Sequence, residues 1–372
     1  MDGQHLQVMK STAELRSQAS TWDLLWHQSS LAAPSARANI VALWVETFAP
    51  EAEFRCLLVE QQGRPVAALP LVGKRFLSVV NAAKLPCNMW AASGGLLIDH
   101  EADVESALEM IVAGLAELPW GVFVFEQISF EEPRWQAFLA ALRQAGWYNS
   151  ILEQHRVGQV EITGDWKAYE ATRKSRHRQR RRRNARMLEK CGVTGLTLHR
   201  DLDKDEVSQL FKLGCEIEER SWKSANGTAI LQNTPVFDYY LREAAQLAEW
   251  GQLELAFLHC GERPIAFCYG WNAKGARFCV KVGYDHTFAK YGPGQQLMMR
   301  LLEQVHADEQ CALYDFHGRL VHWTESWITR DYPVGRLVVS SRGLVNRSIC
   351  RAYTTLHPVL KRLRRRLTRK VF

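Results

Sequence analysis

Hydrophobic and polar positions along the chain alternate between two spacings, and both occur throughout. Apolar residues at helical spacing predict helices over 21–31, 35–48, 101–117, 133–147, 203–222, 235–250 and 292–309. Runs rich in β-branched and aromatic residues predict strands over 54–60, 65–72, 121–128, 195–200, 252–260, 263–272, 276–285 and 311–318. Because helices and strands are interspersed rather than segregated, the pattern predicts an α/β (α+β) fold.

One predicted helix is unusually basic. The stretch "GDWKAYEATRKSRHRQRRRRNARMLEKCG" predicts a single long helix with Asp165 as N-cap and Gly192 as stop signal. Residues 173–186, in its middle, include nine Lys or Arg residues and no acidic one.

Two predicted hairpins share a layout. "LLVEQQGRPVAALPL" (57–71) and "AFLHCGERPIAFCYG" (256–270) each contain an apolar strand, a glycine turn, Arg-Pro and a second apolar strand. A generic hairpin with such a turn is one explanation, and a duplicated α/β module is the other. The order of neighbouring elements favours duplication, and a length of 372 residues suits two domains.

The sequence also shows that positive charge is concentrated in two short segments. The net charge is +7, yet the run at 173–186 and a second run at 361–370 together carry 16 positive charges, so the remainder has a net charge of −9. Nucleic-acid-binding domains usually spread Lys and Arg over a whole face, which argues against that class. The nine cysteines show no zinc-type spacing, which predicts no metal site and a reducing compartment. With no signal-peptide or membrane-spanning pattern, we expect a cytoplasmic protein.

Several motifs in order resemble a known family. They are "ATRKSRHRQRRRRNARMLEKCG", "ERSWKS", "ERPIAFCYGW", "GYDHTFAKYGPGQQLM" and "LYDFHG…W". The chain resembles GNAT-superfamily acyltransferases of the FemAB-like and cellulose-biosynthesis (CelD-like) group. The resemblance implies two tandem GNAT-like modules, at 1–158 and 159–345, followed by a basic helix at 346–372. It also implies that the helix around 173–186 belongs to the fold; a contact with an anionic substrate or with nucleic acid stays open as an alternative.

The resemblance implies acyl-CoA, acetyl-CoA above all, as the donor. A glycine turn that opens a helix is a ready site for its pyrophosphate, because backbone N–H groups and the helix dipole face the anion. "KYGPGQQLMM" has that form, although a plain turn explains it too, and Ala289 stands where the family has a basic or Gln residue. The predicted donor-binding residues are Lys290, Gly292, Gly294, Gln295, Gln296 and Val282, the last through a backbone N–H that polarises the thioester.

Acyl transfer to an amine also requires a base for the ammonium proton. Asp315 and His317 alternate on one strand and so share a face, and His317 has a suitable pKa. Tyr284 completes the predicted catalytic set. Ordinary structural roles for these residues, such as Asp315 capping a turn before Gly318, stay open. The predicted substrate-binding residues are Arg220, Trp222, Lys223 and Trp327.

The sequence leaves two alternative functions open. The segment "RLVHWT" after "DFHG" departs from the family pattern, so a binding protein without catalysis is one alternative. A FemAB-like transferase that uses aminoacyl-tRNA is another. The preferred prediction is acyl transfer to an amine or hydroxyl of a small molecule or of a cell-envelope or polysaccharide precursor. The C-terminal stripe of Leu356, Leu360, Leu363, Leu367 and Val371 predicts a basic amphipathic helix, which either contacts an anionic membrane surface at the inner face or docks on the protein.

Overall fold

A computed structural model describes residues 3–341 and 343–368, apart from the side chains of Trp222, Ala225 and the residues from 359 onward. The chain divides into two compact units. The first unit comprises the residues up to Leu31, Ser35–His155 and the residues from Pro333 onward, and the second comprises Ala32–Pro34 and Arg156–Tyr332. The sequence assigned 333–345 to the second module and 346–372 to a separate helix. The structure corrects this, because both segments belong to the first unit.

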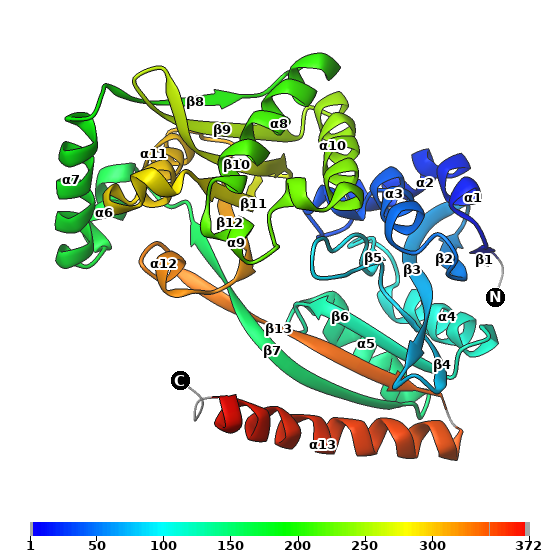
Figure 1. The fold of residues 1–372 in the computed structure, drawn as a ribbon. Coiled ribbons are helices and arrows are strands. Elements are labelled where there is room, and N and C mark those ends of the chain that lie inside the picture. The colour runs from blue at the N-terminus through cyan, green and yellow to red at the C-terminus, as the bar shows by residue number, and fades with distance from the viewer. Residues whose placement is uncertain (1–2, 342, 369–372) are drawn as a thin grey trace. The chain divides into compact units, whose positions relative to one another are not determined.

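The first unit is a mixed sheet with helices. Its strands lie in the order β1 (Gln4–Met9), β2 (Phe54–Gln61), β3 (Arg64–Phe76), β4 (Val80–Lys84), β6 (Val122–Ile128) and β13 (Arg330–Ser340), while β5 (Leu97–Ile98) pairs with β3. Its helices are α1 (Thr12–Ser17), α2 (Ala19–Gln28), η1 (Pro34–Ala36), α3 (Ala38–Phe48), α4 (Val104–Glu117), α5 (Pro133–Gln144) and α13 (Leu344–Thr368) (Figure 1).

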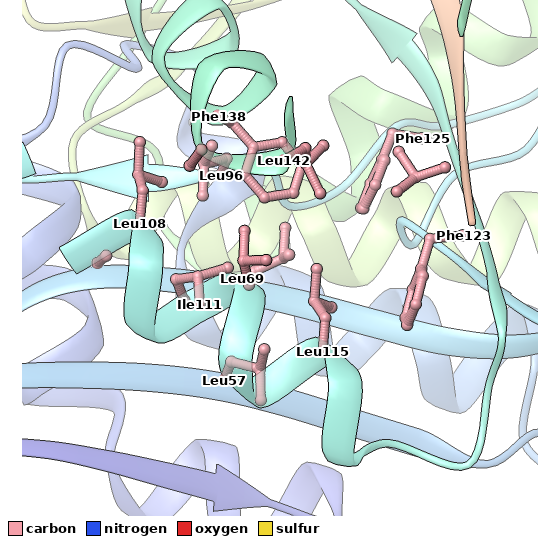
Figure 2. Packing of buried hydrophobic residues seen from close by; sticks show 14 of the residues in the cluster. Leu57, Leu69, Leu96, Leu108, Ile111, Leu115, Phe123, Phe125, Phe138 and Leu142 are labelled. Atoms are coloured by element: carbon pink, nitrogen blue, oxygen red, sulfur yellow. The ribbon is translucent and has the colours of Figure 1, made fainter. Parts of the chain in front are cut away.

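Helices α4 and α5 bury one face of this sheet. Figure 2 shows Leu108, Ile111 and Leu115 of α4 and Phe138 of α5 packed with strand residues of the same cluster, which include Leu57, Leu69, Phe123 and Phe125. Leu108, Ile111 and Leu115 stand at i, i+3 and i+7, which places them on one helical stripe and explains why this face of α4 is buried.

The second unit repeats the architecture. Its strands lie in the order β7 (Tyr148–Glu161), β12 (Leu313–Arg319), β11 (Ala276–Tyr284), β10 (Arg263–Ala273), β9 (Leu253–Cys260) and β8 (Thr194–His199). The helices are α6 (Trp166–Thr172), α7 (Ser175–Glu189), α8 (Lys204–Glu219), α9 (Trp222–Ala225), η2 (Ile230–Gln232), α10 (Thr234–Glu249), η3 (His286–Tyr291), α11 (Pro293–His306) and α12 (His322–Glu325). The predicted mixed α/β class with two modules is confirmed.

The single basic helix predicted over 165–192 is wrong. The structure has α6 and α7, separated at Arg173, whose backbone is extended (φ −79°, ψ 148°). The Arg173 guanidinium donates to the backbone carbonyls of Trp327 and Ile328. These acceptors lie more than 150 residues away, so no local pattern announces the break.

The two predicted hairpins occupy matching places in their sheets. The hairpin β2–β3 follows the edge strand β1, and β9–β10 follows the edge strand β8. In each, the register shifts directly after Arg-Pro, so Val66 and Ile265 each form a bulge. The duplicated layout that the sequence suggested is therefore present in the three-dimensional arrangement of both units.

Sequence patterning missed some elements. β7 and β13 each begin in one unit and end in the other, and their mixed polar and apolar residues gave no clear period. The predicted C-terminal helix is present as α13, while of its predicted stripe only the Leu356 side chain lies within the described part. No helix among the described residues is long and apolar enough to span a bilayer.

Candidate active site

The parallel strands β11 and β12 of the second unit separate along their length. Their backbone pairing covers only Ala276–Phe278 against Leu313–Asp315. Within 279–284 and 316–319, all of which the structure describes, the two strands have no mutual pairing. On its other side β11 pairs with β10 and bulges at Val280, because Tyr269 faces Lys281 whereas Gly270 faces Cys279. Beyond Phe278, β11 therefore runs without backbone pairing to β12.

Asp315 and His317, the predicted catalytic pair, lie on β12 at and just beyond the end of its pairing with β11. The buried Asp315 carboxylate accepts from the backbone N–H of His317 (2.6 Å), from Gln159 Nε2 (2.7 Å) and from Tyr332 Oη (3.0 Å). The bond to His317 is the turn-capping role considered as an alternative for Asp315. It fixes His317 in the left-handed region (φ 52°), which is uncommon for a residue other than glycine.

The His317 imidazole is half-buried between aromatic rings. Its centroid lies 4.9 Å from that of Trp271 and 6.0 Å from that of Phe278. Burial lowers the pKa of His317; Asp315 raises it in part, and Lys281 lowers it further. With a pKa below 6.5, the imidazole is mostly neutral at pH 7 and can accept a proton.

A charged cluster that the sequence analysis missed lies on the same face. The bulge at Val280 places Lys281 on the side of Tyr269, and the Lys281 ammonium lies 5.0 Å from the Tyr240 ring centroid. Burial lowers the pKa of Lys281 to about 8. Nearby, the carboxylate of Glu243 is buried, and burial raises its pKa to about 7. A lysine in the apolar strand "FCVKVGY" was the available signal.

Hydroxyl groups hold the Glu243 carboxylate. Tyr239 Oη donates to Oε1 (2.9 Å) and Tyr269 Oη donates to Oε2 (2.6 Å). The predicted substrate-binding residue Lys223 lies close by: its Nζ donates to Glu218 Oε1 (2.5 Å) and to the carbonyl of Val282 (2.9 Å). Lys223 therefore ties the segment after α8 to the separated part of β11.

The glycine turn has the geometry that the sequence predicted. Gly292 is the N-cap of α11 in the left-handed conformation (φ 63°, ψ 53°), and no side chain caps this helix. The left-handed backbone favours glycine here, and a Cβ at Gly292 would also lie 3.2 Å from Asn184 Nδ2, which would have to shift. The N–H groups of Gln295 and Gln296 donate to Gly292 O (3.0 and 3.1 Å). Of the predicted backbone donors at the helix start, this leaves Gly294 as the one without a bond to the N-cap carbonyl.

The basic helix α7 packs beside this turn, next to η3 and α11 (Figure 1). The Arg181 carbonyl accepts from the Gln296 side chain (3.0 Å). The Arg181 guanidinium is 3% exposed and stacks at 3.8 Å on the Trp327 ring. Its three nitrogens are buried with no hydrogen-bond partner among the described residues. Burial lowers its pKa to about 10, so at neutral pH it is a charged group that lacks an acceptor.

The segment that departs from the family pattern also contacts this turn. Gln295 Nε2 donates to the carbonyl of Trp323 (2.8 Å), whose half-exposed ring packs edge-on against Phe316. Tyr284 lies at the turn as well, 3.7 Å from where a Cβ of Gly294 would stand, and not with His317. Lys290 is exposed, with its ammonium 4.8 Å from the Tyr291 ring centroid.

Two predicted substrate-binding residues have structural contacts. Trp327 is fully buried, so it is placed to support Arg181 rather than to meet an acceptor directly. Arg220 Nε lies 3.3 Å from the carboxylate of the buried Asp285. The side chain of Trp222, the remaining candidate, lies outside the described residues.

Comparisons with known proteins identify the type of domain that holds these residues. Residues 175–323 match the model of an acetyltransferase (GNAT) domain, a range that holds α7, Lys281, the glycine turn and His317. No curated protein sequence matches the chain.

Similar solved structures show the same fold over nearly the whole chain. One is FemX, with 11% identity, 89% of this chain and 96% of that chain covered, and a TM-score of 0.58. A second is the C-terminal domain of a putative lysylphosphatidylglycerol synthetase from Agrobacterium fabrum (14% identity, 93% and 97% covered, TM-score 0.51). A third is a conserved protein of unknown function from Bacteroides thetaiotaomicron (11%, 90% and 100%, 0.53).

Proposed function

We propose that the chain is a GNAT-superfamily acyltransferase of the FemAB-like group, which transfers an acyl group from acyl-CoA to an amine or hydroxyl acceptor. The geometry at the start of α11 is the observation that best supports acyl-CoA as the donor. There an N-cap without a side-chain acceptor lies next to α7, in which the Arg181 carbonyl accepts from Gln296 and the buried Arg181 guanidinium has no hydrogen-bond partner among the described residues. A diphosphate supplies the acceptor oxygens that both lack, so the residues present fit the pyrophosphate of CoA. Gly292 and Gly294 permit its close approach, and the acetyl thioester would follow β11.

The reaction then takes place where β11 and β12 separate. The acceptor nitrogen or oxygen attacks the thioester carbonyl, the new C–N or C–O bond forms, and the C–S bond breaks to release the CoA thiolate. Neutral His317 accepts the proton of the nucleophile. Asp315 fixes the backbone of His317, and we assign it a positioning role. Burial lowers the pKa of His317 and Lys281 lowers it further, so that the base is free of a proton at neutral pH.

A pH–rate profile tests the role of His317. We expect kcat/KM to fall on acidification through the pKa of His317, below 6.5. Since Lys281 disfavours imidazolium, Lys281→Met should raise that pKa and move the acid limb to higher pH. The exposed Lys212 of α8 offers a control, and Lys212→Met should leave the limb in place. An acid limb that Lys281→Met leaves unchanged, or moves to lower pH, would contradict this coupling.

The donor is tested by thermal shift with acetyl-CoA, longer acyl-CoAs and aminoacyl-tRNA. A donor at 100 times its Kd stabilises the folded chain by about 2.7 kcal/mol. Arg176, Arg180 and Arg183 on the exposed face of α7 favour aminoacyl-tRNA as the second candidate donor. Stabilisation by aminoacyl-tRNA and not by any acyl-CoA would replace the first proposal with the second. Binding of acyl-CoA without turnover on any amine or hydroxyl would favour a binding protein.

A further inference from the structure

A row of four charged side chains crosses the sheet of the first unit. Lys74 of β3 lies diagonally across from Lys84 of β4, because Lys74 pairs with Ala82 and Val72 pairs with Lys84. Lys84 pairs with Val124 of β6, two residues before Glu126. Arg336 of β13 forms an ion pair with Glu126. All four side chains are half-buried.

The row lies beside apolar side chains of the same sheet face. Phe76, Val124 and Val338 are each two residues from a member of the row and belong to one cluster, against which Tyr353 of α13 packs. The Arg336 guanidinium also donates to the Tyr353 hydroxyl. Helix α13 therefore contacts the apolar part of this face and one end of the row.

Positive charge exceeds negative charge in the row. Glu126 is paired with Arg336, while Lys84 Nζ donates to the Cys87 carbonyl (2.7 Å) and lies 5.1 Å from the Trp44 ring centroid. Among the described residues, neither lysine forms an ion pair with a carboxylate. Burial lowers the pKa of Lys74, Glu126 raises it in part, and Lys84 and Arg336 lower it further. Three cations thus share one carboxylate.

Without a bound anion, this row of charges destabilises the fold. Neighbouring like charges on a sheet repel, and partial burial strengthens the repulsion. The Nε of Arg336 is also buried without a hydrogen-bond partner in the part of the chain that the structure describes. Outside its two basic runs the chain has a net charge of −9, so the clustering does not follow from a general excess of cations.

We propose that Lys74, Lys84 and Arg336 bind a phosphate group. An excess of two positive charges matches a phosphate monoester or a terminal diphosphate, which carries between about −1.5 and −2 at neutral pH. Lysine ammonium groups bind phosphate as point charges, and an arginine Nε–H adds a directed donor. The site lies wholly within the first unit and does not depend on acyl transfer.

Inorganic pyrophosphate is the probe, measured by isothermal titration calorimetry. Because the start of α11 is a second anion site, the titrations use a Gly294→Asp background. In that background we expect one site to remain. Adding Lys74→Gln should weaken it more than tenfold. Adding Arg75→Gln, which removes the same charge from the exposed opposite face of β3, should change it less than twofold.

Thermal unfolding separates this from a folding defect. Without ligand, Lys74→Gln should unfold at the same temperature as the parent or higher, because it relieves repulsion. Pyrophosphate should raise the unfolding temperature of the parent and not of the variant. Equal loss of binding in Lys74→Gln and Arg75→Gln, or no site left in the Gly294→Asp background, would overturn the proposal. Malonate binding as tightly as pyrophosphate would reassign the site to carboxylates.

Discussion

The two units share one structural device and differ in the helix that follows it. In each, the bulge residue after Arg-Pro accepts a backbone hydrogen bond from a buried aspartate: Asp99 N donates to Val66 O (2.9 Å), and Asp285 N donates to Ile265 O (2.8 Å). In each, the hairpin arginine faces that aspartate, Arg64 at 3.7 Å and Arg263 at 2.5 Å. The repeated contacts are strong evidence of a duplicated module, because a generic hairpin does not require them.

The helices after these aspartates begin differently. Helix α4 of the first unit has Asp103 as N-cap, and its carboxylate accepts from the Ser106 N–H (3.2 Å). Helix α11 of the second unit has Gly292, which offers no side chain. A carboxylate at an N-terminus satisfies the free N–H groups and repels other anions. On the proposed function, one copy of the fold keeps an anion site at this helix start and the other copy closes it.

The largest expected difference concerns the two aspartates. Asp285 is fully buried and accepts from Arg263, Thr287 N and Thr287 Oγ1, whereas Asp99 accepts from Glu101 N and has a longer ion pair. We expect Asp285→Ala to lower the free energy of unfolding by about 3 kcal/mol, and Asp99→Ala by about 1 kcal/mol. Urea denaturation measures both. Equal losses would show that the two aspartates contribute equally to the free energy of unfolding and would contradict this expectation.

Lowering the pH should reduce the contribution of Asp285 to the free energy of unfolding. Burial alone would raise the pKa of Asp285, but hydrogen bonds from Thr287 and the ion pair with Arg263 outweigh it, and the pKa is lowered from 3.8. A group with a lowered pKa stabilises the fold above its unfolded pKa and loses that contribution as pH falls through the folded value. The difference between parent and Asp285→Ala should therefore persist at pH 5 and shrink only below pH 4.

The next largest effect concerns Arg181 of the second unit. Arg181→Met keeps the apolar stem on Trp327 and removes an unpaired buried charge. We expect acetyl-CoA affinity to fall by about 2 kcal/mol, the size of a hydrogen bond to a charged group, while the unfolding temperature stays level or rises. Arg180→Met, at an exposed neighbouring position, is the control and should change neither. A lower unfolding temperature with unchanged affinity would make Arg181 purely structural.

Local sequence signals were enough to predict the fold class and the positions of some candidate site residues, whose roles stay predictions. The Arg-Pro hairpins, the glycine turn and the Asp315–His317 pair have short-range patterns, and the structure has each where the pattern predicted it. The break at Arg173, the stacking of Arg181 on Trp327 and the Lys281–Glu243 cluster depend on contacts between distant segments. Helical periodicity assigns only apolar residues to the buried face of a helix. It therefore cannot indicate that one guanidinium among nine basic residues is buried.

The central claim is that the donor binds at the start of α11 and not at the start of α4. Calorimetric titration of acetyl-CoA into the parent chain, Gly294→Asp and Asp103→Ala tests it most directly. We expect one site per chain, a loss of affinity of more than tenfold (about 1.4 kcal/mol) in Gly294→Asp, and unchanged affinity in Asp103→Ala, which should only lower stability by about 1 kcal/mol. Unchanged affinity in Gly294→Asp would contradict the claim.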